Sequence, residues 1–153
     1  MTVSNSGGAN LDELVAVAKA LGHPGRLRML AMLRGGQLCV CQLTSVLKSS
    51  GSTVSEHLSE LRRAGLVLER KRGRWVHYRL TDDHSLRGLV IRLLRLVSDD
   101  PQIVEDARVV EAVRAIPVDV LCGAGLNLAA VGVQPAARTG PRRRSRRNPA
   151  HVN

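Results

Sequence analysis

Two thiols, Cys39 and Cys41, flank a valine in the segment GQLCVCQL, residues 36–43. Cysteines at this spacing suit three roles: binding a soft metal ion, forming a disulfide, or filling an apolar core. The N-terminal residues lack the basic and apolar regions of a signal peptide, so we expect a cytoplasmic protein. The chain has three cysteines. An odd number of reduced cysteines favours metal binding or thiol reactivity over a structural disulfide.

The spacing restricts how the two thiols act together. Two sulfur ligands of one ion lie within about 4 Å of each other, because each metal–sulfur bond is roughly 2.3 Å long. Residues two apart on a regular α-helix point about 200° away from each other. Cys39 and Cys41 therefore share an ion only if they precede a helix or if its first turn unwinds.

Charge and composition limit the classes of partner. The chain has 153 residues and a formal net charge of +10, which favours a polyanion such as nucleic acid. Six arginines between residues 138 and 147 leave only +4 for the rest, so DNA binding has to rest on a specific motif. The chain has one Trp, one Tyr and no Phe, and a core of short aliphatic residues favours further burial in a dimer. No segment is apolar enough to span a bilayer, and we expect no membrane partner.

Hydrophobic periodicity predicts a mainly α-helical domain over residues 11–116 with a small β-hairpin. Residues 1–10 and the Gly/Pro/Arg-rich residues 117–153 are expected to be disordered. In the first helix, the apolar face is Leu11, Leu14, Val15 and Ala18. Helices are predicted over about 11–21, 24–34, 40–48, 53–63, 86–97 and 102–115, and the strands over 66–70 and 75–80.

A helix, a short turn, a second helix and a basic hairpin, in this order, indicate a winged helix-turn-helix. Small hydroxylated residues at the start of the reading helix fit the major groove, and a basic hairpin neutralises phosphates. The candidate groove-facing residues are Ser50, Ser52, Thr53, Ser55, Glu56 and His57, although Ser50 or Ser52 could equally serve only as the helix N-cap. The candidate phosphate contacts are Arg62, Arg63, Lys71, Arg72, Arg74 and Arg79. The arginines of 142–147 either add non-specific DNA affinity or solubilise the tail.

Three segments, LGHPGRLRMLAMLRGGQLCVCQL, STVSEHLSELRRAGLV and KRGRWVHYRL, resemble the ArsR/SmtB family of repressors. The Cys-Val-Cys segment at the start of the third helix resembles the arsenical-resistance repressors of that family. The resemblance covers roughly residues 11–98. It implies a homodimer, joined through residues 11–21 and 86–97, that binds double-stranded operator DNA. It also implies release when trivalent arsenic or antimony binds, with no permanent cofactor.

In this interpretation, the soft metalloid binds the thiolates of Cys39 and Cys41. Binding would distort the start of the third helix and thereby shift the reading helix. Some relatives carry a third cysteine where this chain has Thr44. The third ligand is therefore solvent, a small thiol or Cys122, and the alternative interpretation of Cys122 is a free thiol in the tail.

Parts of the sequence also bear on other functions. Zinc-sensing relatives use an Asp-x-His pair, which Asp82 and His84 match, but the ligands expected about ten residues later are missing. Asp82 is better interpreted as a carboxylate at a helix N-terminus. A thiol-redox-responsive repressor and a winged-helix module for interaction or DNA architecture, without metal sensing, stay open as alternatives. No motif of a phosphate loop, metalloprotease or nucleophile elbow is present, so an enzyme is not expected.

Overall fold

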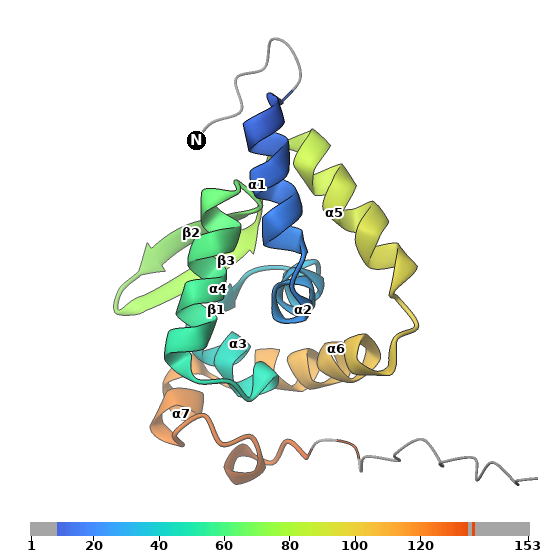
Figure 1. The fold of residues 1–153 in the computed structure, drawn as a ribbon. Coiled ribbons are helices and arrows are strands. Elements are labelled where there is room, and N and C mark those ends of the chain that lie inside the picture. Colours follow the sequence, from blue (N-terminus) through green and yellow to red (C-terminus); the bar gives the residue numbers. More distant parts are fainter. Residues whose placement is uncertain (1–8, 135, 137–153) are drawn as a thin grey trace, which may run out of the picture.

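A computed structural model of the chain describes residues 9–134 and 136 (Figure 1). Helices dominate it, and three short strands form one sheet. In chain order the elements are α1 (Leu11–Leu21), α2 (Pro24–Leu33), β1 (Leu38–Cys39), α3 (Val40–Leu47), α4 (Gly51–Arg63), β2 (Val67–Arg72), β3 (Trp75–Leu80), α5 (His84–Leu96), α6 (Pro101–Arg114), α7 (Val118–Gly123) and the 3-10 turn η1 (Ala129–Val131).

Local sequence signals explain where the first helices begin. Asn10 and Glu13 form a capping box at the start of α1, in which each side chain accepts a hydrogen bond from the other residue's backbone amide. Pro24 occupies the first turn of α2, where its missing amide hydrogen costs nothing. The helices then enclose a core of aliphatic side chains. Its fully buried residues include Met29, Leu30, Leu43, Leu58 and Leu61.

The sheet has one strand more than the sequence predicts. β2 and β3 form the expected antiparallel hairpin, from Val67 opposite Leu80 to Arg72 opposite Trp75. β1 pairs with the other edge of β3 and places Cys39 opposite His77. A two-residue strand carries no periodicity of its own, so only its pairing with a distant segment reveals it.

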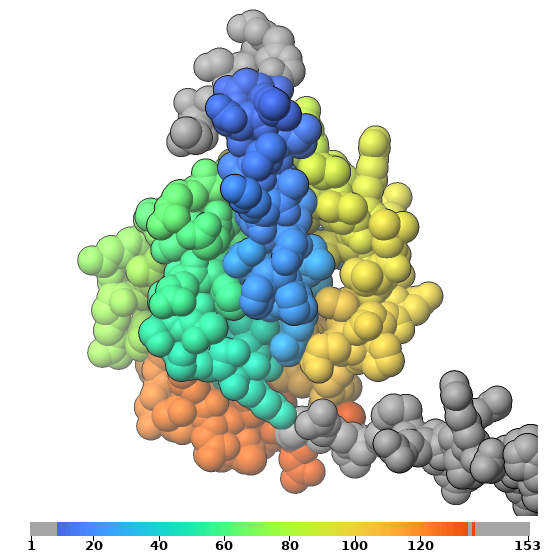
Figure 2. All heavy atoms as spheres, viewed as in Figure 1, coloured from blue at the N-terminus to red at the C-terminus, as the bar shows by residue number. Residues whose placement is uncertain are grey.

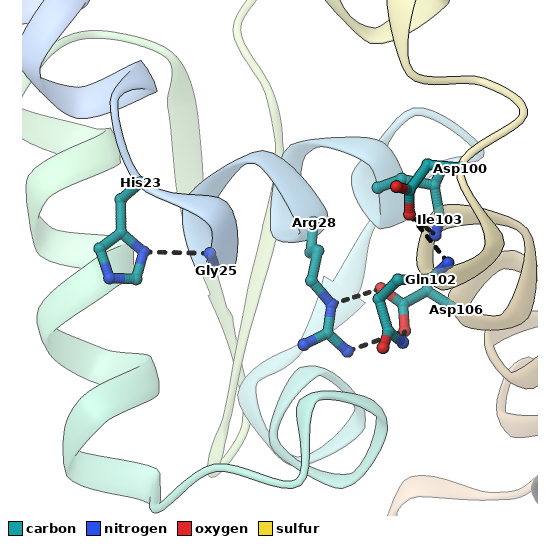
Figure 3. Close-up of polar contacts among 7 residues, drawn as sticks. All are labelled: His23, Gly25, Arg28, Asp100, Gln102, Ile103 and Asp106. Atoms are coloured by element: carbon teal, nitrogen blue, oxygen red, sulfur yellow. Dashed lines mark hydrogen bonds and ion pairs between the residues drawn. The ribbon is translucent and has the colours of Figure 1, made fainter. Parts of the chain in front are cut away.

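Helix α6 ties the two ends of α2 to the rest of the domain. Arg28 of α2 donates two hydrogen bonds, of 2.6 and 2.8 Å, to the buried carboxylate of Asp106 (Figure 3). Arg114, at the end of α6, donates to the backbone carbonyls of Met32, Gly36 and Gln37. These carbonyls lie at the end of α2 and in the loop that leads into β1, so Arg114 holds that loop in place.

The prediction of disorder after residue 116 is wrong for the part of that segment that the structure describes. α7 and η1 lie beneath α3 and α4, where the orange segment covers that face of the domain in Figure 2. Leu121, Leu128 and Val133 join the core. Three widely spaced apolar side chains anchor the segment, although the glycines between them hide this pattern in the sequence. Residues 1–8 and 137–153, with the arginines of 142–147, lie outside the described residues.

In the described part of the chain, no helix combines the length and apolar character that crossing a membrane requires.

Candidate functional site

The reading helix α4 presents a polar face beside a buried apolar one. Val54, Leu58 and Leu61 point into the core. The hydroxyl of Ser50 accepts a hydrogen bond from the backbone amide of Thr53 at 3.2 Å, so Ser50 is the N-cap. Of the predicted groove-facing residues, Ser50, Ser52, Ser55 and Glu56 are exposed, whereas Thr53 and His57 are half-buried.

His57 packs back against the junction of α1 and α2. Its ring centroid lies 4.3 Å from that of His23, whose Nδ1 accepts the backbone amide of Gly25 at 3.0 Å. Burial lowers the pKa of His57, and the neighbouring His23 and Arg26 lower it further. His57 therefore joins the reading helix α4 to the start of α2, a contact between distant segments that no sequence pattern indicates.

The basic side chains of the wing separate into two groups. Lys71, Arg72 and Arg74 are exposed around the hairpin turn, and the Arg74 guanidinium lies 4.8 Å from the centre of the Trp75 ring. The other three predicted phosphate contacts already have carboxylate partners. Arg62 lies 2.6 Å from Glu69, Arg63 lies 2.6 Å from Glu60, and Arg79 pairs with Asp82.

That last pair corrects the interpretation of Asp82. The carboxylate that caps α5 belongs to Asp83, which accepts the backbone amide of Leu86 at 2.9 Å. Asp82 instead binds Arg79, and this ion pair lowers the pKa of Asp82. The two residues could not be distinguished in the sequence because both precede the same helix.

Cys39 lies before the helix rather than on it. Its backbone is extended, with φ −83° and ψ 162°, and it forms the N-cap of α3. Its sulfur accepts the backbone amide of Gln42 at 3.4 Å, while the Gln42 side chain accepts the amide of Cys39 at 2.9 Å. Cys41 stands in the first helical turn and is half-buried, whereas Cys39 is almost fully buried. Cys39 alone precedes the helix, so the two thiols meet only half of the first condition that the spacing sets.

The third cysteine, Cys122, is on α7, which packs against the helix α3 that carries Cys41. Burial raises the pKa of Cys39, and burial together with Cys122 raises the pKa of Cys41 to about 11. None of the three cysteines is in a disulfide. Thr44 is buried, and its hydroxyl donates to the carbonyl of Val40 at 2.8 Å. This hydroxyl is therefore already engaged within the helix, which disfavours Thr44 as a ligand.

The thiols are neighbours without forming a closed site. Within residues 9–134 and 136, no three Cys, His, Asp or Glu side chains are gathered closely enough to hold a metal ion. A ligand that bonds to more than two of them must therefore draw them together.

Comparison with known proteins assigns the chain to a family. The family model described as "Bacterial regulatory protein, arsR family" matches residues 23–68, from the start of α2 into β2. The chain is 42% identical over 100 residues to the arsenic resistance transcriptional regulator ArsR1 of Pseudomonas putida, a match covering 59% of this chain and 78% of that protein. The chain belongs to the ArsR family.

Two further ArsR-type proteins extend the comparison. The arsenical resistance operon repressor of Escherichia coli is 44% identical over 68 residues, which cover 44% of this chain and 58% of that protein. A homodimeric winged helix-turn-helix DNA-binding domain from Mycobacterium bovis, a possible ArsR-family regulator, superposes with a TM-score of 0.52. It shares 28% identity, over 63% of this chain and 92% of that one. As an ArsR-family protein, the chain is a winged helix-turn-helix regulator of transcription and not an enzyme.

Proposed function

We propose that this chain is a cytoplasmic repressor that binds operator DNA as a homodimer and leaves it when trivalent arsenic or antimony binds Cys39 and Cys41. The observation that carries the proposal is the position of Cys39. Because Cys39 precedes α3 in an extended conformation, its thiol is not forced to the opposite side of the helix from Cys41. The similarity to arsenic-resistance regulators supports the same inducer.

The protonation state of the two thiols is compatible with binding of arsenite. In neutral solution arsenite is arsenous acid, As(OH)₃, and each sulfur that bonds to arsenic releases one hydroxyl. The proton of the thiol leaves with that hydroxyl as water, so neutral thiols and arsenous acid give neutral products and no net charge is released. Burial keeps the thiols of Cys39 and Cys41 protonated at neutral pH. The site is therefore matched to a neutral metalloid hydroxide.

Two connections link the thiols to the DNA-binding surface. Cys39 is paired with His77 of β3, and β3 continues to the basic turn of the wing. Cys41 lies on α3, which packs against the reading helix α4. Pulling Cys39 and Cys41 onto one atom changes the start of α3 and the pairing of β1. Both the wing and the reading helix then move, and operator affinity falls.

Exposed leucines support the proposed homodimer. On α1, Leu11 and Leu14 are 76% and 54% exposed, and Leu96 of α5 is 81% exposed. The face of α1 that periodicity marks as apolar thus points to solvent, while Val17 and Ala20 on another face enter the core. Figure 2 shows α1 standing out from the body with α5 on one side. A second copy that covers these leucines would bring two reading helices to successive major grooves.

The redox alternative requires the thiols to be in their deprotonated form. Peroxides react with thiolates, and a raised pKa keeps the thiolate fraction low. The same feature that suits arsenous acid therefore disfavours oxidation by peroxide. The alternative of an architectural module predicts that no inducer changes DNA binding.

One titration tests these functions together. The reduced full-length protein, bound to its own promoter DNA, is titrated separately with arsenite, antimonite, zinc and hydrogen peroxide while fluorescence anisotropy reports release. We expect release by arsenite and antimonite. Cys39→Ser and Cys41→Ser should bind the DNA normally and resist release, whereas Val40→Ala, between them, should still respond. Release of both serine variants at the wild-type arsenite concentration would contradict the proposal, as would release by peroxide alone.

A further inference from the structure

The end of the described chain is fastened to helix α6. Glu105 accepts a hydrogen bond from the backbone amide of Ala136 at 2.9 Å, and Arg108 donates one to the carbonyl of Gln134 at 2.8 Å. Glu105 and Arg108 also pair with each other at 2.8 Å. Hydrogen bonds from Arg108 and from the amide of Ala136 lower the pKa of Glu105 to about 2, so the carboxylate is ionised at neutral pH. We call these contacts the α6 anchor.

The α6 anchor lies beside the turn that precedes the reading helix. Ala136 and Glu105 line the same pocket as Lys48, the residue at which α3 ends. Ser50, two residues later, is the N-cap of α4. In Figure 1 the chain runs from α7 back beneath α3 towards α6. Because the N-terminal residues of a reading helix face the bases, the α6 anchor lies near the side of the domain that α4 presents to DNA.

The sequence that follows the α6 anchor is strongly basic. Six arginines lie between residues 138 and 147, and no acidic residue follows Asp119. These cations therefore have no carboxylate side chain in their own segment to pair with. Arg138 is two residues and Arg147 eleven residues after Ala136. Since a chain spans at most about 3.6 Å per residue, the arginines begin within about 7 Å of the anchor and end within about 40 Å of it.

We infer that these six arginines act as an arm that binds phosphates of the DNA duplex beside the half-site that α4 reads. This inference rests on the operator binding of the proposed function and does not depend on the inducer. Each strand of a duplex carries one phosphate per about 3.4 Å of axis, so an arm of this length passes several phosphates outside the half-site. Each arginine that contacts a phosphate releases a counterion, whatever the flanking sequence is.

The α6 anchor determines where the arm begins. Val133 packs into the core, and the α6 anchor fixes the chain three residues further on. A shorter length of chain between the folded domain and the first arginine raises the effective concentration of the arginines near the adjoining phosphates. We therefore expect the contacts to be concentrated in the DNA next to the half-site rather than spread evenly along the duplex.

The first test varies the arm and the DNA together. Full-length protein with all six arginines replaced by glutamine is compared with the wild type on two duplexes from its own promoter. One duplex is trimmed to the footprint of the glutamine variant, and the other adds flanks of about 15 base pairs, which exceed the reach of the arm. The glutamine variant should lower the salt slope by at least about two on the long duplex and leave it nearly unchanged on the trimmed one. Lysine at the six positions keeps the charge and should preserve the wild-type slope.

The second test releases the α6 anchor and keeps every arginine. Glu105→Ala removes the acceptor of the Ala136 amide and raises the net charge by one, which alone would strengthen DNA binding. Hydroxyl-radical footprinting should nevertheless show weaker protection next to the half-site, spread over more base pairs. Glu111→Ala makes the same change of charge at an exposed position of the same helix and should leave the footprint unchanged. Thermal melts check that each variant is folded.

The outcomes separate this inference from the function on which it rests. Equal salt slopes of the wild type and the glutamine variant on the long duplex would overturn the arm. A difference that is as large on the trimmed duplex would also overturn it, because the arginines would then contact the half-site itself. A flank footprint that Glu105→Ala leaves unchanged would overturn the role of the α6 anchor. If the wild type protects no half-site on its promoter, the proposed operator binding itself fails.

Discussion

Cys39 lies directly opposite His77 in the antiparallel pairing of β1 with β3. The same β3 strand pairs along its other edge with β2, and the two strands meet at the basic turn of the wing. One of the proposed inducer ligands thus pairs directly with a strand of the hairpin that carries the basic turn. This relationship joins a thiol and a wing that are far apart in the sequence.

Arsenite should loosen the pairing of β1 with β3. Drawing Cys39 toward Cys41 pulls it away from His77, so the backbone amides of the neighbouring Leu38–Tyr78 pair should exchange with solvent faster. Hydrogen exchange with mass spectrometry measures this. The Leu68–Arg79 pair between β2 and β3 is the internal control. Unchanged exchange at Tyr78 in the arsenite-bound protein would rule out transmission through this strand.

Arg72 and Arg62 should differ in their contribution to DNA binding. Arg72 is exposed near the turn of the wing, so Arg72→Ala should weaken binding to all sequences and reduce the salt slope by about one. Arg62 already lies 2.6 Å from Glu69, and its replacement should change the slope less. Anisotropy titrations over a salt series measure both variants. An equal change in slope would mean that the Arg62–Glu69 pair opens on DNA.

The Arg28–Asp106 pair should be a main support of the fold. Asp106 is 2% exposed and also accepts a hydrogen bond from Gln102 at 2.9 Å, and this carboxylate raises the pKa of Arg28. Asp106→Asn leaves a cation without its partner and should lower the free energy of unfolding by about 3 kcal/mol. Urea denaturation gives this value. Glu105→Gln removes a half-buried partner of the exposed Arg108, and we expect a smaller loss of stability from it.

Protonation of His57 should destabilise the folded state in mild acid. The groups around this ring are His23, Arg26 and Glu56, and burial with the two basic neighbours lowers its pKa below 6.5. As the pH falls below 6.5, the unfolded chain takes up this proton first, so stability decreases until the folded state is protonated as well. His57→Gln should therefore lose less stability than the wild type between about pH 7 and pH 5. His84→Gln, at an exposed site, should follow the wild type.

Charge on the outer face of α1 should disrupt the proposed dimer. Leu14→Arg places a cation where a second copy would bury a leucine, so sedimentation should shift from dimer to monomer and operator affinity should fall. Val104→Arg on α6 is the matched control, because Val104 is equally 54% exposed. A dimer that persists with Leu14→Arg would place the interface elsewhere.

Features set by local patterns could be predicted from the sequence. The apolar period of 86–97 and the basic turn at 71–74 gave α5 and the hairpin, and the serines before α4 gave its cap. The strand at Leu38 and the docking of α7 depend on contacts between distant segments, so no window of sequence contains them. For the same reason, the carboxylate partners of Arg62 and Arg79 and the contact of His57 with His23 were not predicted. The spacing singled out Cys39 and Cys41 in the sequence, whereas the packing of α7, which carries Cys122, against α3 was not predicted.

The bonds from Arg114 to the loop before β1 affect how strongly the thiols hold a ligand. Arg114 donates to the carbonyls of Gly36 and Gln37, directly before the strand that carries Cys39. In an unfolded chain this loop is free, and the entropy of ordering it would oppose a ligand shared by Cys39 and Cys41. The bonds of Arg114 raise the effective concentration of one sulfur near the other before any ligand arrives. The affinity of the chelate is therefore a property of the folded domain, and arsenic that binds only the native state should raise its melting temperature.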